Sequence, residues 1–132
     1  MTPTTAELLD GCVKAIATPP EAEDLALYLK GRLSLVVLVN ILAAQEAEGG
    51  VAARVAENAA LRAVLGDASA AEDDLTIAGL DAVNAALRRR LIALHTAVEE
   101  AGDRTRDREI LALYRRMAAL RELVLPPIPA AA

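Results

Sequence analysis

His95 is the only histidine in the chain, and histidine is the side chain that most readily takes up and releases a proton near neutral pH. It is therefore the one candidate for a general base. Glu99 follows one helical turn later, where an ion pair within a helix is the simplest interpretation. A di-metal helical bundle needs Glu-x-x-His pairs, and Ile92 stands where that Glu would be. We predict no catalytic residue, no metal centre and no cofactor.

Asn40 is the second residue that could do chemistry, because it interrupts an apolar helix. It lies at helical spacing in line with apolar residues, namely Leu29, Leu33, Val36, Ala43 and Ala47. A buried amide needs partners for its donors and its acceptor, so Asn40 either bonds to another helix or faces a ligand. We favour the first interpretation, a polar group that fixes helix register or dimer pairing.

Arg32 lies two turns before Asn40 and has the geometry to bind a carboxylate or a phosphate through two parallel hydrogen bonds. A salt bridge to a neighbouring helix is the expected use of such a side chain. Glu57 belongs to a polar side of a later helix. If Arg32, Asn40 and Glu57 converged, they would form an anion or amide site. The candidate ligand-binding residues are therefore Arg32, Asn40, Glu57 and His95.

Residues 33–44 read LSLVVLVNILAA, and only Ser34 and Asn40 among them are polar. A helix with this sequence is apolar on nearly every side, so other protein or lipid must surround it. Twelve residues are too few to span a bilayer, which predicts that the chain does not bind a membrane. We expect this run to be the hub of the fold.

Helix boundaries can be read from caps and breakers. Thr4 and Glu7 have the spacing of a capping box, which starts a first helix that Pro19 and Pro20 end. A second helix is expected over residues 21–48, with a possible break at Gly31, and a third over 51–65. Residues 67–74 form a loop. A fourth helix runs from residue 74 or 81 to 102, and a fifth from about 107 to the prolines at 126 and 127.

The composition agrees with helices. The chain has 132 residues, is 55% hydrophobic and contains only two aromatic side chains, both Tyr, while Ala, the strongest helix former, is abundant. We predict an all-α fold, a four- to five-helix bundle in one domain spanning residues 1–132, with flexible tails at 1–3 and 126–132.

The formal net charge of -5 argues against nucleic acid, whose binding depends on basic side chains that neutralise phosphates. Arg88, Arg89 and Arg90 are interpreted as a solvated face or a contact to an acidic partner. The single Cys12 cannot form an intrachain disulfide and is expected to be a small core residue. Because the N-terminus lacks the basic and apolar regions of a signal peptide, a cytoplasmic protein is expected.

Four short segments carry a family resemblance: PTTAELL at residues 3–9, GRL at 31–33, NIL at 40–42 and AENAALRAVLG at 56–66. With these segments the chain resembles a family of small uncharacterised helical bacterial proteins. The genes of that family lie beside aminoglycoside-phosphotransferase-like and acyl-CoA-dehydrogenase-like proteins. The resemblance implies an accessory role with a kinase-like or acyl-CoA-dehydrogenase-like partner, and it implies no catalytic residue.

Two functions follow as hypotheses. The favoured one is a non-catalytic helical interaction protein that forms a homodimer, because residues 33–44 have more apolar perimeter than thin, Ala-rich neighbours cover. The alternative is a small-molecule binding protein or enzyme for an anionic or acyl-type ligand. Its pocket would lie between helices and use Arg32, Asn40 and His95.

Overall fold

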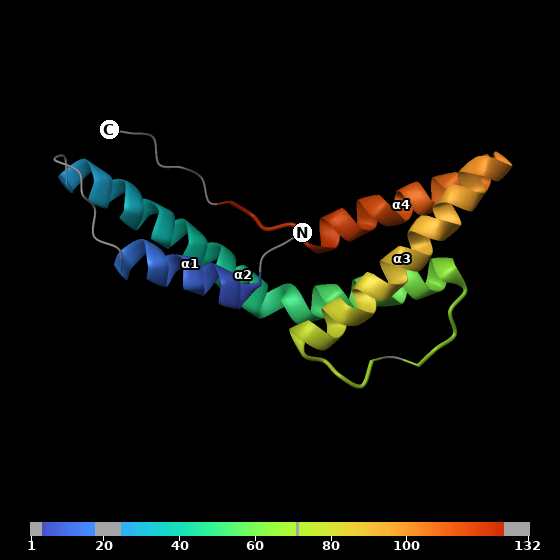
Figure 1. Cartoon of the computed structure of the whole chain (residues 1–132), viewed down its shortest axis with the longest axis horizontal. Helices are drawn as coiled ribbons and strands as arrows, with labels where there is room; N and C mark the ends of the chain where they lie inside the picture. The colour runs from blue at the N-terminus through green and yellow to red at the C-terminus, as the bar shows by residue number, and fades with distance from the viewer. Residues whose placement is uncertain (1–3, 18–24, 71, 126–132) are drawn as a thin grey trace. The chain divides into compact units, whose positions relative to one another are not determined.

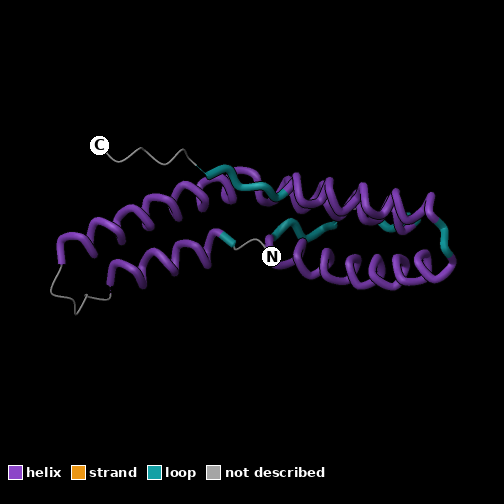
Figure 2. Tube along the Cα trace, turned by 90° about the horizontal axis from the view of Figure 1, so that it is seen from above, coloured by secondary structure: helices purple, strands orange, loops and turns teal. Residues whose placement is uncertain are grey.

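The computed structural model describes residues 4–17, 25–70 and 72–125. These residues form four α-helices and no strand. Figure 1 and Figure 2 draw the helices within each part of the chain. The helices are α1 (Thr5–Ala17), α2 (Leu25–Leu65), α3 (Ile77–Ala101) and α4 (Arg104–Leu120). The predicted all-α helical bundle is confirmed. The two predicted tails and the predicted Pro19-Pro20 break lie outside the described residues.

The chain divides into two units. The first unit comprises residues 1–48 and 123–132, and the second comprises residues 49–122. Helix α2 contributes residues to both units. The first unit contains α1 and the beginning of α2, and the second contains the end of α2 together with α3 and α4.

The start of α1 has the predicted capping box. The backbone N of Thr4 donates to Glu7 Oε2 at 2.7 Å, and the backbone N of Glu7 donates back to Thr4 Oγ1 at 3.3 Å. This reciprocal pair satisfies two backbone donors that the first helical turn leaves without partners. Cys12 on α1 is buried, and its Sγ lies 3.9 Å from the carbonyl oxygen of Val36 on α2. The prediction of a core cysteine is confirmed.

Helix α2 differs from the prediction, because it passes through Gly31, Gly49 and Gly50 without a break. The predicted end at Gly49 and Gly50 is wrong. A glycine inside a helix costs about 1 kcal/mol relative to Ala, which the strong helix formers on either side offset. The helix ends instead at Gly66, as predicted, where φ is 64° and the left-handed conformation favours glycine.

Helices α3 and α4 form an antiparallel hairpin, which is visible in both Figure 1 and Figure 2. The Thr76 side chain caps α3 by accepting a hydrogen bond from Gly79 N at 3.1 Å. Gly102, with φ of 66°, ends the helix. Asp103 then caps α4 by accepting hydrogen bonds from the next backbone amides, so α4 begins at Arg104 rather than at the predicted Asp107.

The chain leaves α4 at Leu120, earlier than the prolines alone require. From residue 123 onward the chain belongs to the first unit. There the Gln45 side chain makes two hydrogen bonds to the backbone of Val124. Gln45 Nε2 donates to Val124 O at 2.8 Å, and Val124 N donates to Gln45 Oε1 at 2.8 Å. These two hydrogen bonds satisfy the backbone N–H and C=O of Val124, which lies beyond the end of α4.

A cluster of buried apolar side chains forms the core of the second unit. It joins side chains from three helices: Ala60 and Leu61 of α2, Leu87, Leu91 and Val98 of α3, and Ile110, Leu113 and Met117 of α4. The prediction that residues 33–44 form the hub of the fold is wrong for the single chain, because Leu33, Leu35 and Val37 are exposed.

Candidate functional site

The four predicted ligand-binding residues do not form one described site. Arg32 and Asn40 belong to the first unit, whereas Glu57 and His95 belong to the second. Within the second unit, Glu57 and His95 take part in two separate sets of contacts. The predicted convergence of Arg32, Asn40 and Glu57 therefore finds no support among the described contacts.

Asn40 lies on the exposed surface of α2, and the prediction that it is buried is wrong. Its Nδ2 donates to Val36 O, one turn earlier in the same helix, at 2.9 Å. The physical reason is that residues in line with Asn40, such as Leu29 and Leu33, are themselves exposed in the single chain. Arg32 is half-buried and already takes part in a polar interaction.

Glu57 is fully buried, with 0% of its surface exposed, and three side chains donate to its carboxylate. Oε1 accepts hydrogen bonds from Asn84 Nδ2 at 2.8 Å and from Arg88 Nη2 at 2.6 Å. Oε2 accepts one from Arg121 Nε at 2.6 Å. Burial acts to raise the pKa of Glu57, but the hydrogen bonds from Arg88 and Asn84 and the charges of both arginines outweigh it. The pKa is lowered from its ordinary value of 4.5.

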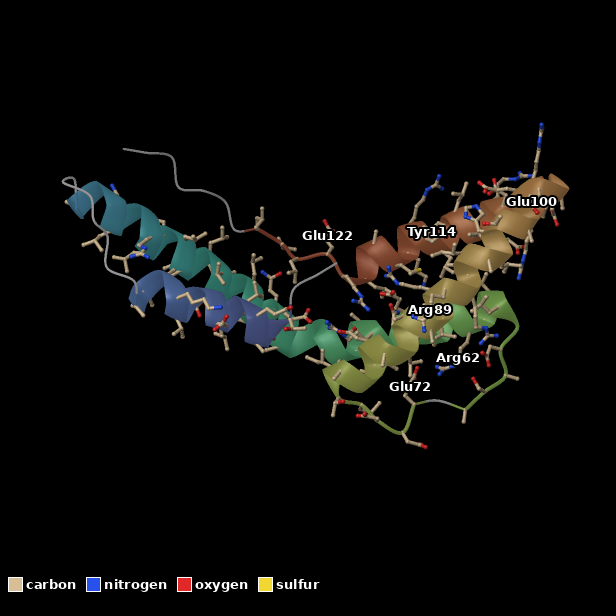
Figure 3. The ribbon with its side chains drawn as sticks, in the orientation of Figure 1. Arg62, Glu72, Arg89, Glu100, Tyr114 and Glu122 are labelled. Atoms are coloured by element: carbon tan, nitrogen blue, oxygen red, sulfur yellow. The ribbon has the colours of Figure 1, made fainter. Side chains whose placement is uncertain are left out.

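The hydrogen bonds continue from Glu57 toward the loop before α3. Asn84 Nδ2 also donates to Asn58 Oδ1 at 2.8 Å, and Asn58 Nδ2 donates to Glu72 Oε1 at 3.0 Å. Arg62 Nη1 donates to the same oxygen of Glu72 at 2.6 Å, and Figure 3 labels this pair. The loop is thereby attached to α2 and α3 through buried side chains.

The network also continues in the other direction, through Asp81 of α3. Arg121 Nη2 lies 3.7 Å from Asp81 Oδ1, and Arg54 Nε donates to the same oxygen at 2.8 Å. Arg54 is almost completely buried and also donates from Nη1 to Gly50 O at 2.9 Å. We call this network the polar cluster; its members are Arg54, Glu57, Asn58, Arg62, Glu72, Asp81, Asn84, Arg88 and Arg121.

The polar cluster is suited to holding helices together rather than to proton transfer. A carboxylate with both oxygens engaged by arginines stays ionised and is a weak base. Its partners come from α2, α3 and the end of α4, so each ion pair joins elements that are distant in sequence. Buried ion pairs of this kind favour one arrangement of the helices, because removal of one partner leaves an uncompensated charge.

His95 belongs to the hairpin of α3 and α4 near its turn. His95 Nε2 lies 2.9 Å from Asp107 Oδ1, and Nδ1 lies 3.5 Å from the hydroxyl of Tyr114. The predicted partner, Glu99, is at 3.9 Å, so Asp107 is the closer carboxylate. Both ring nitrogens thus face protein groups. In the part of the chain that the structure describes, no group of three or more metal-ligating side chains is placed to hold an ion.

The sequence predicted a polar side of the helix at Glu57 but not the other members of the polar cluster. Asn84 is the one available signal, because it lies among the core leucines of α3 and is itself buried. Arg54, Asp81 and Arg121 give no such signal, since charged residues on helices are usually solvated. Arg88 was expected to lie on a solvated face or to contact an acidic partner, and it contacts the carboxylate of Glu57.

An exposed apolar surface in the first unit is the stronger candidate for function. Leu29, Leu33 and Val37 recur every four residues on α2 and are 41%, 62% and 59% exposed. We call these three residues the α2 stripe. Helix α1 adds a further apolar row that is exposed, formed by Leu9, Val13 and Ile16. Contiguous exposed apolar side chains of this kind usually mark a surface that contacts another molecule.

Among the described residues, one helical segment, Leu29–Leu65, is long and apolar enough to cross a membrane by length and composition alone. Its uncharged part is shorter. No Asp, Glu, Lys or Arg occurs from Leu33 to Gln45, which is a rise of about 20 Å in a helix. The hydrocarbon core of a bilayer is about 30 Å thick, so a span would bury charges at one end or both.

Comparison of the chain with known protein families, with curated proteins and with solved structures finds no match.

Proposed function

We propose that this chain is a non-catalytic interaction protein that forms a homodimer through the α2 stripe. The observation that carries the proposal is the exposure of Leu29, Leu33 and Val37 on one line of a helix. Burying them against a second copy removes apolar surface from water, at about 25 cal/mol per Å². Two-fold pairing is the commonest way for one chain to cover such a surface.

The state of the polar residues supports a role without catalysis. The carboxylate of Glu57 is engaged on both oxygens, and both ring nitrogens of His95 face protein groups. A general base needs a free lone pair within reach of a substrate. A kinase-like or acyl-CoA-dehydrogenase-like partner, which the sequence resemblance implies, would use another surface or compete for this one.

Sedimentation equilibrium of the purified chain tests the proposal. At about 50 µM we expect a mass twice that of the 13.8 kDa chain. Val37→Glu places two charges in the interface and should give a monomer. The matched control is Ile92→Glu, because Ile92 is 62% exposed on α3, in the second unit, and should leave the dimer unchanged.

Two results would overturn the proposal. One is a wild-type chain that stays monomeric at this concentration. The other is a chain that floats with phosphatidylcholine vesicles instead of dimerising, which would assign the α2 stripe to a lipid surface.

A further inference from the structure

We infer that the two α2 helices of the dimer pair antiparallel, with Asn40 of one copy beside Asn40 of the other at the two-fold axis. The inference rests on the proposed homodimer and adds the direction and register of its contact. It is carried by three features of the exposed side of α2 between residues 29 and 48: side-chain size, charge and the position of the single amide.

The size of the exposed side chains changes along the helix. The residues before Asn40 are bulky, since they are the α2 stripe, whereas Ala44 and Ala47 after it are exposed and small. Antiparallel pairing centred on Asn40 places Leu33 opposite Ala47 of the other copy and Val37 beside Ala44. Large side chains then fill the space beside small ones. Parallel pairing would set leucine against leucine at one end and leave a gap at the other.

The charges beside the stripe follow the same symmetry. Lys30 and Glu48 are both exposed, and they are 18 residues apart in the sequence. At about 3.6 residues per turn this separation is five turns, so both lie on the same side of the helix. In an antiparallel pair centred on Asn40, Lys30 of one copy lies two residues, about 3 Å along the axis, from the level of Glu48 of the other, so their long side chains can pair, twice by symmetry. In a parallel pair in register, Lys30 and Glu48 would be about 27 Å apart along the axis and could not pair.

Asn40 lies within one residue of the midpoint between Lys30 and Glu48. Its Nδ2 already donates to Val36 O, and within the described chain its second N–H and its Oδ1 are left for another partner. An amide can donate to and accept from a second amide, so two copies of Asn40 satisfy each other across a two-fold axis. A single Asn in an apolar helical interface fixes register in the same way in coiled coils.

A charge swap tests the direction of pairing. We expect Lys30→Glu alone and Glu48→Lys alone each to raise the dimer dissociation constant about tenfold, because each turns two attractive pairs into two repulsive ones. The double variant should restore the wild-type dissociation constant. If the helices were parallel, Lys30 and Glu48 would be too far apart to pair, and each single variant would leave the dissociation constant unchanged.

Disulfide cross-linking tests the register. All chains carry the substitution Cys12→Ala, so that only the introduced thiols react. Chains with Leu33→Cys and chains with Ala47→Cys, mixed and oxidised, should cross-link to each other, while neither should cross-link alone. A dimer in which Leu33→Cys links to itself would overturn the antiparallel inference but leave the homodimer intact. A monomeric wild-type chain would instead overturn the homodimer.

Discussion

Arg121 donates from Nε to Oε2 of Glu57 at 2.6 Å, and this contact joins residues that are 64 positions apart in the sequence. Arg121 is also the residue at which α4 ends. The end of the last helix is therefore held on α2 by a buried charge. The same carboxylate accepts from Arg88 of α3, so one side chain links three helices.

Replacement of Glu57 should destabilise the second unit strongly. Glu57→Ala leaves the guanidinium groups of Arg88 and Arg121 and the amide of Asn84 without their shared acceptor. We expect a loss of about 3–5 kcal/mol in the free energy of unfolding, measured in urea. The control is Glu109→Ala, which removes an exposed carboxylate of α4 and should cost less than about 1 kcal/mol. Equal losses in the two variants would contradict a stabilising role for the polar cluster.

The two arginines on Glu57 should differ in their effect. The Arg88 side chain is 47% exposed, whereas that of Arg121 is 17% exposed. An ion pair that is screened by water contributes less, so Arg88→Met should cost about 1 kcal/mol or less and Arg121→Met about 2 kcal/mol. Thermal unfolding monitored by circular dichroism ranks the two variants. The opposite ranking would show that Arg88 is the principal partner of the carboxylate.

The stability of the chain should fall in acid because of Glu57. The pKa of this carboxyl is lowered below its ordinary value of 4.5 in the folded state. Its contribution is therefore complete above pH 4.5 and is lost as the pH falls through the lower, folded-state pKa. Urea unfolding between pH 7 and pH 3 should show this decline. In Glu57→Gln the decline should be smaller, and an identical pH profile would exclude Glu57 as its source.

Two glycines should respond to alanine in opposite directions. Gly49 lies inside α2, and a Cβ added there meets nothing within 4 Å, so Gly49→Ala should stabilise the chain by about 1 kcal/mol. Gly102 has a φ of 66°, which alanine adopts only with strain, so Gly102→Ala should destabilise it by about 1 kcal/mol. Thermal denaturation of both variants measures the difference. A loss of stability in Gly49→Ala would argue that α2 does not run through this position.

Local features of the fold were predictable because they depend on neighbours in the sequence. The capping box at Thr4, the helix ends at Gly66 and Gly102 and the burial of Cys12 all follow from patterns within a few residues. The continuity of α2 through Gly49 and Gly50 was not predictable in this way. It depends on the sum of propensities over 41 residues, against which two glycines are a small cost.

The candidate sites were harder to predict, because their partners come from distant segments. The spacing of Glu57 and Asn58 marks a polar side of a helix but says nothing of Arg121. Asn40 illustrates the second difficulty. Helical periodicity places it in line with Leu29 and Leu33, but it does not tell whether that line faces the same chain, and in this structure it does not.

The turn at Gly102 has a consequence for the order in which the second unit folds. It brings α3 and α4 together across a very short loop, so the entropic cost of closing that loop is small. The contact from Arg121 to Glu57 closes a loop of 64 residues, which costs more entropy. We expect the hairpin to form in the folding transition state and the Glu57 contacts to form after it. Substitutions in the polar cluster would then chiefly accelerate unfolding, while the folding rate would be set at the hairpin.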